Sequence, residues 1–161
     1  MLLMMPLMLA AGATFDPQSS FAWAEFSADP SRGGEAHKVE IGTVPGRTEP
    51  GEYVYWLRLT TSKGGQDVVS YADTRTCSAA KEVIARMEGL GVAQGAAPHN
   101  WGNIAITADG TLYRVRMPVK YGDMTGEATL RTNVGTPVAA FVEQSLNDLR
   151  PCWRPDLPPA R

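Results

Sequence analysis

The segment SYADTRTCSAAKEVIARM, residues 70–87, places a cysteine at the start of a predicted helix. A thiol in that position experiences the partial positive charge of a helix N-terminus, which makes it more acidic and more nucleophilic. A cysteine hydrolase adds a histidine base and an Asn or Asp that orients it, and His99, Asn100 and Asp73 offer those groups. No motif typical of such enzymes surrounds Cys77, however, and we therefore assign no catalytic residue.

The alternative chemistry for this thiol is a disulfide bond. The chain contains 2 cysteines, Cys77 and Cys152, and an even count in an exported protein favours pairing. The bond would close a loop of about 76 residues, which corresponds to about 4 kcal/mol of stability from loop-closure entropy. Because Cys77 begins the first predicted helix and Cys152 follows the second, we expect the tail to fold back or the helices to cross.

Export is indicated by the first residues, MLLMMPLMLAAGA, which are apolar and uncharged. The small residues at 11–13 match a signal-peptidase site, and the segment is shorter than the roughly 20 residues that span a bilayer. We predict a signal peptide over 1–13, a mature domain over 14–161, and a periplasmic or secreted location. The segment lacks a basic n-region, so we expect the start codon to lie upstream; a buried N-terminal helix or strand is the alternative.

Overall composition excludes several classes of partner. The formal net charge of −2 gives no electrostatic reason to expect nucleic acid, and no membrane span is expected after cleavage. His37 and His99 are too far apart for the usual zinc spacings, so we predict no metal and no cofactor. The 16 glycines and 12 prolines favour short strands joined by turns.

Hydrophobic periodicity predicts an α+β fold: a mainly antiparallel sheet of six to seven short strands with two helices packed on one face. The first helix is predicted with Thr76 as its N-cap, and the second begins at Thr136-Pro137 and ends before Pro151. A hairpin is predicted over 103–117 around Asp109-Gly110. Each helix follows a strand pair, which suggests shared architecture, although a true sequence repeat is the less favoured interpretation. The predicted strands are 21–27, 37–44, 53–61, 67–72, the two strands of the 103–117 hairpin, and 127–134.

Strand alternation generates the first binding candidate. If the helices cover the face with Leu57 and Val115, the opposite face presents a tryptophan and several arginines. Such a set can stack a sugar ring or hold a carboxylate, as an envelope polysaccharide or an acidic protein would offer. An ordinary solvated face with arginines paired to acidic neighbours is the alternative. The candidate residues are Trp56, Arg58, Arg114 and Arg116, with Arg131 joining them if its strand is adjacent.

The second candidate is the loop PHNWG, residues 98–102. His99, Asn100 and Trp101 are suitable for contacting a ligand, although Trp101 could instead anchor the loop to the core. We interpret the protein as a non-enzymatic exported binding or accessory domain. A small cell-envelope hydrolase using Cys77 or the His99 loop is the alternative.

Overall fold

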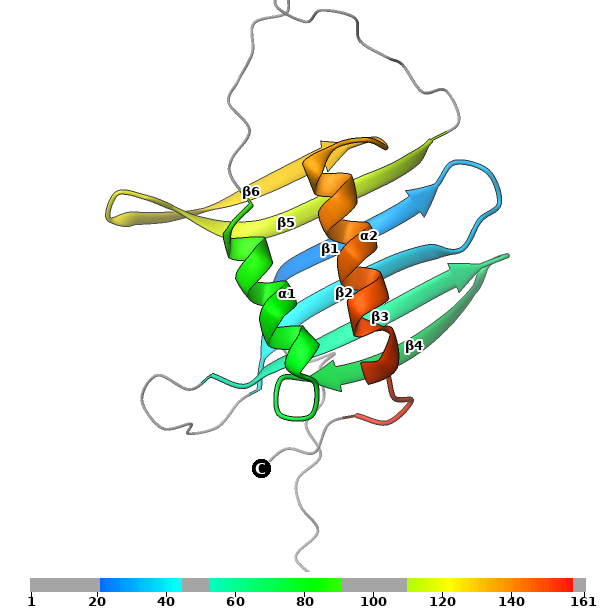
Figure 1. Ribbon diagram of the computed structural model, residues 1–161, viewed down its shortest axis with the longest axis horizontal. Coiled ribbons are helices and arrows are strands. Elements are labelled where there is room, and N and C mark those ends of the chain that lie inside the picture. Colours follow the sequence, from blue (N-terminus) through cyan, green and yellow to red (C-terminus); the bar gives the residue numbers. More distant parts are fainter. Residues whose placement is uncertain (1–20, 45–52, 91–109, 158–161) are drawn as a thin grey trace, which may run out of the picture.

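The computed structural model describes residues 21–44, 53–90 and 110–157, and within them the strands form a six-stranded open sheet (Figure 1). The strand order is β4-β3-β2-β1-β5-β6, and every neighbouring pair is antiparallel. The strands are β1 (Ala22–Pro30), β2 (Ala36–Thr43), β3 (Tyr55–Lys63), β4 (Gln66–Asp73), β5 (Thr111–Tyr121) and β6 (Met124–Thr132).

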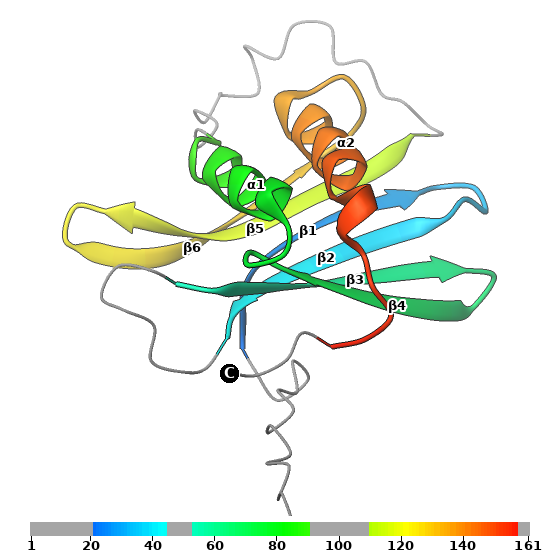
Figure 2. The same ribbon diagram turned by 60° about the horizontal axis from the view of Figure 1, so that its bottom comes forward.

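Two helices, α1 (Ser78–Glu88) and α2 (Pro137–Leu149), lie on the same face of this sheet (Figure 2). A short 3-10 helix, Arg150–Cys152, continues α2. The predicted α+β class, with both helices on one face, is confirmed. Each helix follows a hairpin, β3-β4 or β5-β6, and these two units flank the central β1-β2 hairpin. The shared architecture is therefore present, whereas a sequence repeat stays a hypothesis.

Two tight turns define the outer hairpins. Lys63 pairs with Gln66 across Gly64-Gly65, and both glycines have positive φ, of 59° and 81°. Tyr121 pairs with Met124 across Gly122-Asp123, where Gly122 has φ of 60°. Glycine adopts these angles without a Cβ clash, and they match the twist of a two-residue hairpin.

The hairpin that contains β5 is β5-β6, and the hairpin predicted over 103–117 around Asp109-Gly110 was wrong. Residues 103–109 of the expected hairpin lie outside the described residues. Its other strand, β5, has β1 as hydrogen-bonded neighbour on one side and β6 on the other, so that Tyr113 is paired with both Ala28 and Thr132. No edge of β5 remains at Tyr113 for a strand preceding Asp109-Gly110. The local turn signal was outweighed by long-range pairing with β1.

The hydrophobic core lies between the sheet and the helices. It is built from alternate residues of the central strands, together with the inward face of each helix, as the predicted periodicities require. The helix side chains in it include Val83, Met87, Phe141, Val142 and Leu149; the strand side chains include Phe26, Val39, Ile41, Leu57, Tyr113 and Val115.

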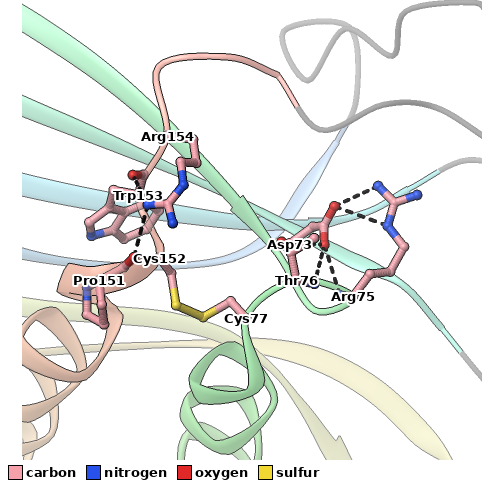
Figure 3. The surroundings of a disulfide bond; sticks show 8 residues. All are labelled: Asp73, Arg75, Thr76, Cys77, Pro151, Cys152, Trp153 and Arg154. Atoms are coloured by element: carbon pink, nitrogen blue, oxygen red, sulfur yellow. Dashed lines mark hydrogen bonds and ion pairs between the residues drawn. A yellow bond between two sulfur atoms is a disulfide. The ribbon is translucent and has the colours of Figure 1, made fainter.

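A disulfide bond joins Cys77 to Cys152, with an S–S distance of 2.04 Å, which confirms the predicted pairing (Figure 3). The helices run in opposite directions, so the N-terminus of α1 lies beside the C-terminal end of α2 (Figure 1). Neither a helix crossing nor a long return of the tail is needed, and that part of the expectation was wrong. Antiparallel neighbours bring these two ends together directly.

Asp73 organises the turn that leads from β4 into α1. Its buried carboxylate accepts hydrogen bonds from the backbone N–H groups of Arg75 (2.8 Å) and Thr76 (3.0 Å), and from the Arg75 guanidinium (2.6 Å). The carbonyl of Asp73 also accepts from the backbone N–H of Cys77. Thr76 is thus engaged with Asp73, and the N-cap of α1 is Cys77, one residue later than predicted.

The second helix begins as predicted. Thr136 is its N-cap and accepts a hydrogen bond from the Ala139 N–H, with Pro137 in the first turn. Two polar contacts then fix the helix layer. Arg86 of α1 donates to Asp148 of α2 at 2.7 Å, and the Tyr113 hydroxyl of β5 donates to the Glu143 carboxylate of α2.

The disulfide yields the first testable prediction. Replacing both cysteines, as Cys77→Ala/Cys152→Ala, should lower the free energy of unfolding by about 4 kcal/mol, because the unfolded chain loses a loop constraint. Urea unfolding of the oxidised protein, the reduced protein and the double variant measures this. Equal unfolding midpoints for the oxidised and reduced proteins would contradict it.

The Asp73 turn yields the second testable prediction. Burial favours the protonated acid, but the hydrogen bonds from Arg75 and Thr76 outweigh burial and hold the pKa of Asp73 below its ordinary 3.8. This contribution to stability is therefore complete above the unfolded-state pKa and is lost as pH falls through the lower folded-state pKa.

We expect Asp73→Asn to cost about 2 kcal/mol at neutral pH and to reduce the loss of stability on acidification between about pH 5 and pH 2. Chemical unfolding across that pH range is the measurement. Asp156→Asn, at an exposed site, is the matched control. An unchanged acid profile in Asp73→Asn would show that the turn does not depend on the charge.

Candidate functional site

The predicted tryptophan and arginines lie on the sheet face opposite the helices. Their strand neighbours Leu57, Tyr113 and Val115 contribute to the helix-side core, so Trp56, Arg58, Arg114 and Arg116 point the other way. They do not form one cluster, however. Strands β2 and β1 separate β3 from β5, which places the two pairs roughly 14 Å apart.

Trp56 cannot stack a sugar ring in this structure, because its side chain has 0% exposure. It packs with Val44 and Val54 in a small second hydrophobic cluster. Its register partner on β2 is Gly42, and a Cβ atom at that position would overlap the indole ring. The indole thus lies over the glycine backbone and serves as packing.

Two of the arginines are neutralised by acidic neighbours. Arg58 donates to Glu40 at 2.7 Å, and Glu40 also accepts an ion pair from Lys38 at 3.1 Å. Arg116 pairs with Glu127 at 2.8 Å and with Glu25 at 3.6 Å. Burial alone would raise the pKa of Glu40, but the bonds from Arg58 and Lys38 prevail and keep that pKa below its ordinary value.

Strand register arranges this face in two rows that run across the strands. The balanced row, Arg58, Glu40, Glu25, Arg116 and Thr129, has two bases and two acids.

The neighbouring basic row consists of directly paired residues from five strands and contains no carboxylate: Thr60, Lys38, Ser27, Arg114 and Arg131. Neither Arg114 nor Arg131 makes an ion pair within the described part of the chain.

A shallow groove of about 220 Å³ follows most of the basic row. Its polar lining includes Arg114, Lys38, Ser27 and Thr60, and it also contains one carboxylate, that of Asp29. Arg131 lies directly across from Arg114 on β6, as the sequence analysis anticipated for an adjacent strand. The groove therefore combines basic groups with hydroxyl groups on the sheet face opposite the helices.

The remaining sequence candidates are Cys77 and the loop that contains His99, Asn100 and Trp101. Cys77 is 2% exposed and its sulfur is bonded to Cys152, so it offers no thiol as a nucleophile. His99, Asn100 and Trp101 lie outside the described residues, and the loop containing them stays a prediction. Among the described residues, no group of three or more His, Cys, Asp or Glu side chains is placed to hold a metal ion.

Sequence reasoning missed a second hollow, on the helix side of the sheet. A pocket of about 560 Å³ lies between the C-terminal end of α1 and the C-terminal half of β5. A neighbouring hollow of about 280 Å³ is lined by three aromatic rings, and both cavities share Trp23 and Glu88. The lining includes Trp23, Ile84, Met87, Glu88, Leu90, Met117 and Val119 in the larger pocket, and Trp23, Thr43, Tyr53, Tyr55 and Glu88 in the smaller one.

A β-bulge explains why alternation did not predict this position for Trp23. Ala22 pairs with Gly42 and Ala24 with Ile41, so an advance of two residues along β1 corresponds to an advance of only one residue along β2. The extra residue is Trp23, and a bulge redirects the side chain at that position. Its ring meets Tyr55 edge-on at a centroid distance of 5.6 Å.

Comparisons with known proteins assign no family. A scan against protein-family models found no match, and neither did searches of curated proteins and of solved structures. In the described residues, no helix combines the length and the apolar character needed to cross a membrane. The function must therefore be argued from the chemistry of these surfaces.

The packing of Trp56 yields a third prediction. Gly42→Ala should lower the free energy of unfolding by about 2 kcal/mol, because the added methyl group displaces the indole. Thermal or urea unfolding measures the loss, and Gly89→Ala, where a Cβ would make only ordinary contacts, is the control. Adding Trp56→Phe to Gly42→Ala should restore part of the loss, and equal stability of Gly42→Ala and wild type would contradict the close approach.

Proposed function

We propose that this protein is an exported, non-catalytic binding domain whose basic row holds an acidic polysaccharide. The apolar segment at residues 1–13 and the Cys77–Cys152 bond support export, since disulfides persist in oxidising compartments. The carboxylate or sulfate groups of such a polymer provide the negative charge that would neutralise the basic row. A periplasmic or secreted location gives access to it.

The observation that carries the proposal is the direct pairing of Arg114 with Arg131. Like charges directly opposite each other on neighbouring strands destabilise a sheet. The chain compensates Arg58 and Arg116 with glutamates, whereas neither Arg114 nor Arg131 forms an ion pair among the described residues. An anion between the two guanidinium groups would relieve the repulsion and accept bidentate hydrogen bonds.

The hydroxyls favour a sugar over a bare anion. Ser27 and Thr60 belong to the same row and line the groove with Lys38 and Arg114. Hydroxyl side chains both donate and accept, which suits the hydroxyl groups of a uronic acid residue. The row crosses five strands, so several adjacent sugars could contact it.

The hydrolase alternative has less support. Its proposed nucleophile, Cys77, is consumed by the disulfide, and the remaining option rests on His99 alone. We therefore place binding ahead of catalysis.

The fourth prediction tests the basic row. Arg114→Ala/Arg131→Ala should weaken binding of an oligogalacturonate at least tenfold, because two charge-assisted hydrogen bonds are lost. Each such bond contributes about 1.5–3 kcal/mol, and about 1.4 kcal/mol corresponds to a tenfold change in affinity. Isothermal titration calorimetry at low and moderate salt measures the affinity. The thermal midpoint should not fall, since the substitution also removes a repulsive pair.

The matched control removes two exposed charges from the helix layer, as Lys81→Ala/Arg150→Ala, and should retain binding. Neutral dextran should not bind to the wild type. Binding of poly-glutamate but not of oligogalacturonate would reassign the row to an acidic protein. Absence of binding to either polymer, or an equal loss in the control variant, would overturn the proposal.

A further inference from the structure

The two cavities at the end of α1 share Trp23 and Glu88, and together they offer two properties that one ligand can satisfy. The larger, of about 560 Å³, is within the range of small-molecule sites and is mostly apolar. Ile84, Met87, Met117 and Val119 provide its hydrophobic wall. Such a wall accommodates an aliphatic or aromatic group.

The smaller cavity is suited to a cation. Trp23, Tyr55 and Tyr53 line it, with centroid distances of 5.6 Å between Trp23 and Tyr55 and 6.3 Å between Tyr55 and Tyr53. Aromatic faces attract cations through their negative quadrupole, and several rings together recognise ammonium groups. Tyr53 is 62% exposed, so this end of the site is open to solvent.

Glu88 supplies a carboxylate at the junction of the two cavities. It is the last residue of α1, where the helix C-terminus adds partial negative charge. Glu88 makes no ion pair within the described part of the chain. Burial, Glu88 and Tyr53 together raise the pKa of Tyr55, which agrees with a negative charge close to that ring.

Lys120 is the only basic residue in the described lining of the two cavities. Lys120 lines the larger cavity and is absent from the described lining of the smaller one, which has Glu88 as its charged group. A ligand is thus favoured with its cation at the aromatic end and its apolar part toward β5.

We propose that the two cavities form one binding site for a soluble organic cation with a short apolar chain, in which Trp23, Tyr53, Tyr55 and Glu88 contact the ammonium group. The site lies on the helix side of the sheet and is independent of the basic row. The two proposals can fail separately, since they require ligands of opposite charge.

Hexyltrimethylammonium is the probe, with hexanol and hexanoate as neutral and anionic ligands of equal chain length. In NMR spectra, the Trp23 indole N–H resonance, identified by its loss in Trp23→Phe, should shift on titration with the cation. The affinity should exceed that for tetramethylammonium, by about fourfold for each buried methylene. Hexanol should bind more weakly than the cation, and hexanoate should not bind at a detectable level.

Variants of Glu88 and Tyr53 then separate the contribution of the negative charge to binding from that of the aromatic rings. Glu88→Gln should weaken binding of the cation about fivefold, whereas Glu82→Gln, at an exposed position on the same helix, should not. Tyr53→Leu should weaken binding, whereas Tyr53→Phe, which keeps the ring, should not. Glu88→Lys should reverse the preference from hexyltrimethylammonium to hexanoate.

Three results would overturn the proposal. Equal affinity for the three hexyl ligands, with no effect of Glu88→Gln, would show a purely apolar pocket. An unperturbed Trp23 resonance in the presence of the cation would show that the cavity stays empty. Cosedimentation with phosphatidylcholine vesicles, without binding of the soluble probe, would assign the aromatic end to a lipid headgroup instead.

Discussion

The bond between Cys77 and Cys152 is the constraint on which the helix layer depends. It fixes the start of α1 to the end of α2, and the Asp73 turn fixes that same point to β4. Since α1 is anchored at its N-terminus, the position of its other end is determined by packing along the helix and by the Arg86–Asp148 ion pair. Glu88 reaches the aromatic rings of β1 and β3 for this reason, because a helix of 11 residues spans roughly 16 Å.

Much of the fold could be predicted from local pattern. Alternation in YVYWLRLTT correctly assigned Leu57 to the helix side and Arg58 to the opposite side, and Thr136-Pro137 correctly marked the start of α2. These features depend on the alternation of side chains along one strand, or on an N-cap residue, and both can be recognised within a few residues of sequence. The pairing of the only two cysteines was also accessible, because the sequence offers just one connectivity.

The candidate sites were less accessible because they depend on contacts between distant segments. The order of strands places β2 and β1 between β3 and β5, and this separated Trp56 from Arg114. The burial of Trp56 depends on Gly42, and the orientation of Trp23 depends on a bulge opposite Gly42 and Ile41. The hairpin predicted at Asp109-Gly110 was wrong for the converse reason: its turn signal was local, but β1 and β6 occupy both edges of β5 at Tyr113.

The two rows of the open face show where the sequence departs from the simplest stable solution. In the balanced row, every arginine has a glutamate partner, so each charged side chain in the row is compensated. In the adjacent row, Arg114 faces Arg131 although threonine or glutamate on β6 would remove the repulsion, as Thr129 and Glu127 do for Arg116. Backbone pairing on both sides of β5 keeps the Cα atoms of Arg114 and Arg131 directly opposite each other regardless of the repulsion between their side chains. A violation of a local rule that the surrounding structure sustains is the expected signature of a site that an external ligand completes.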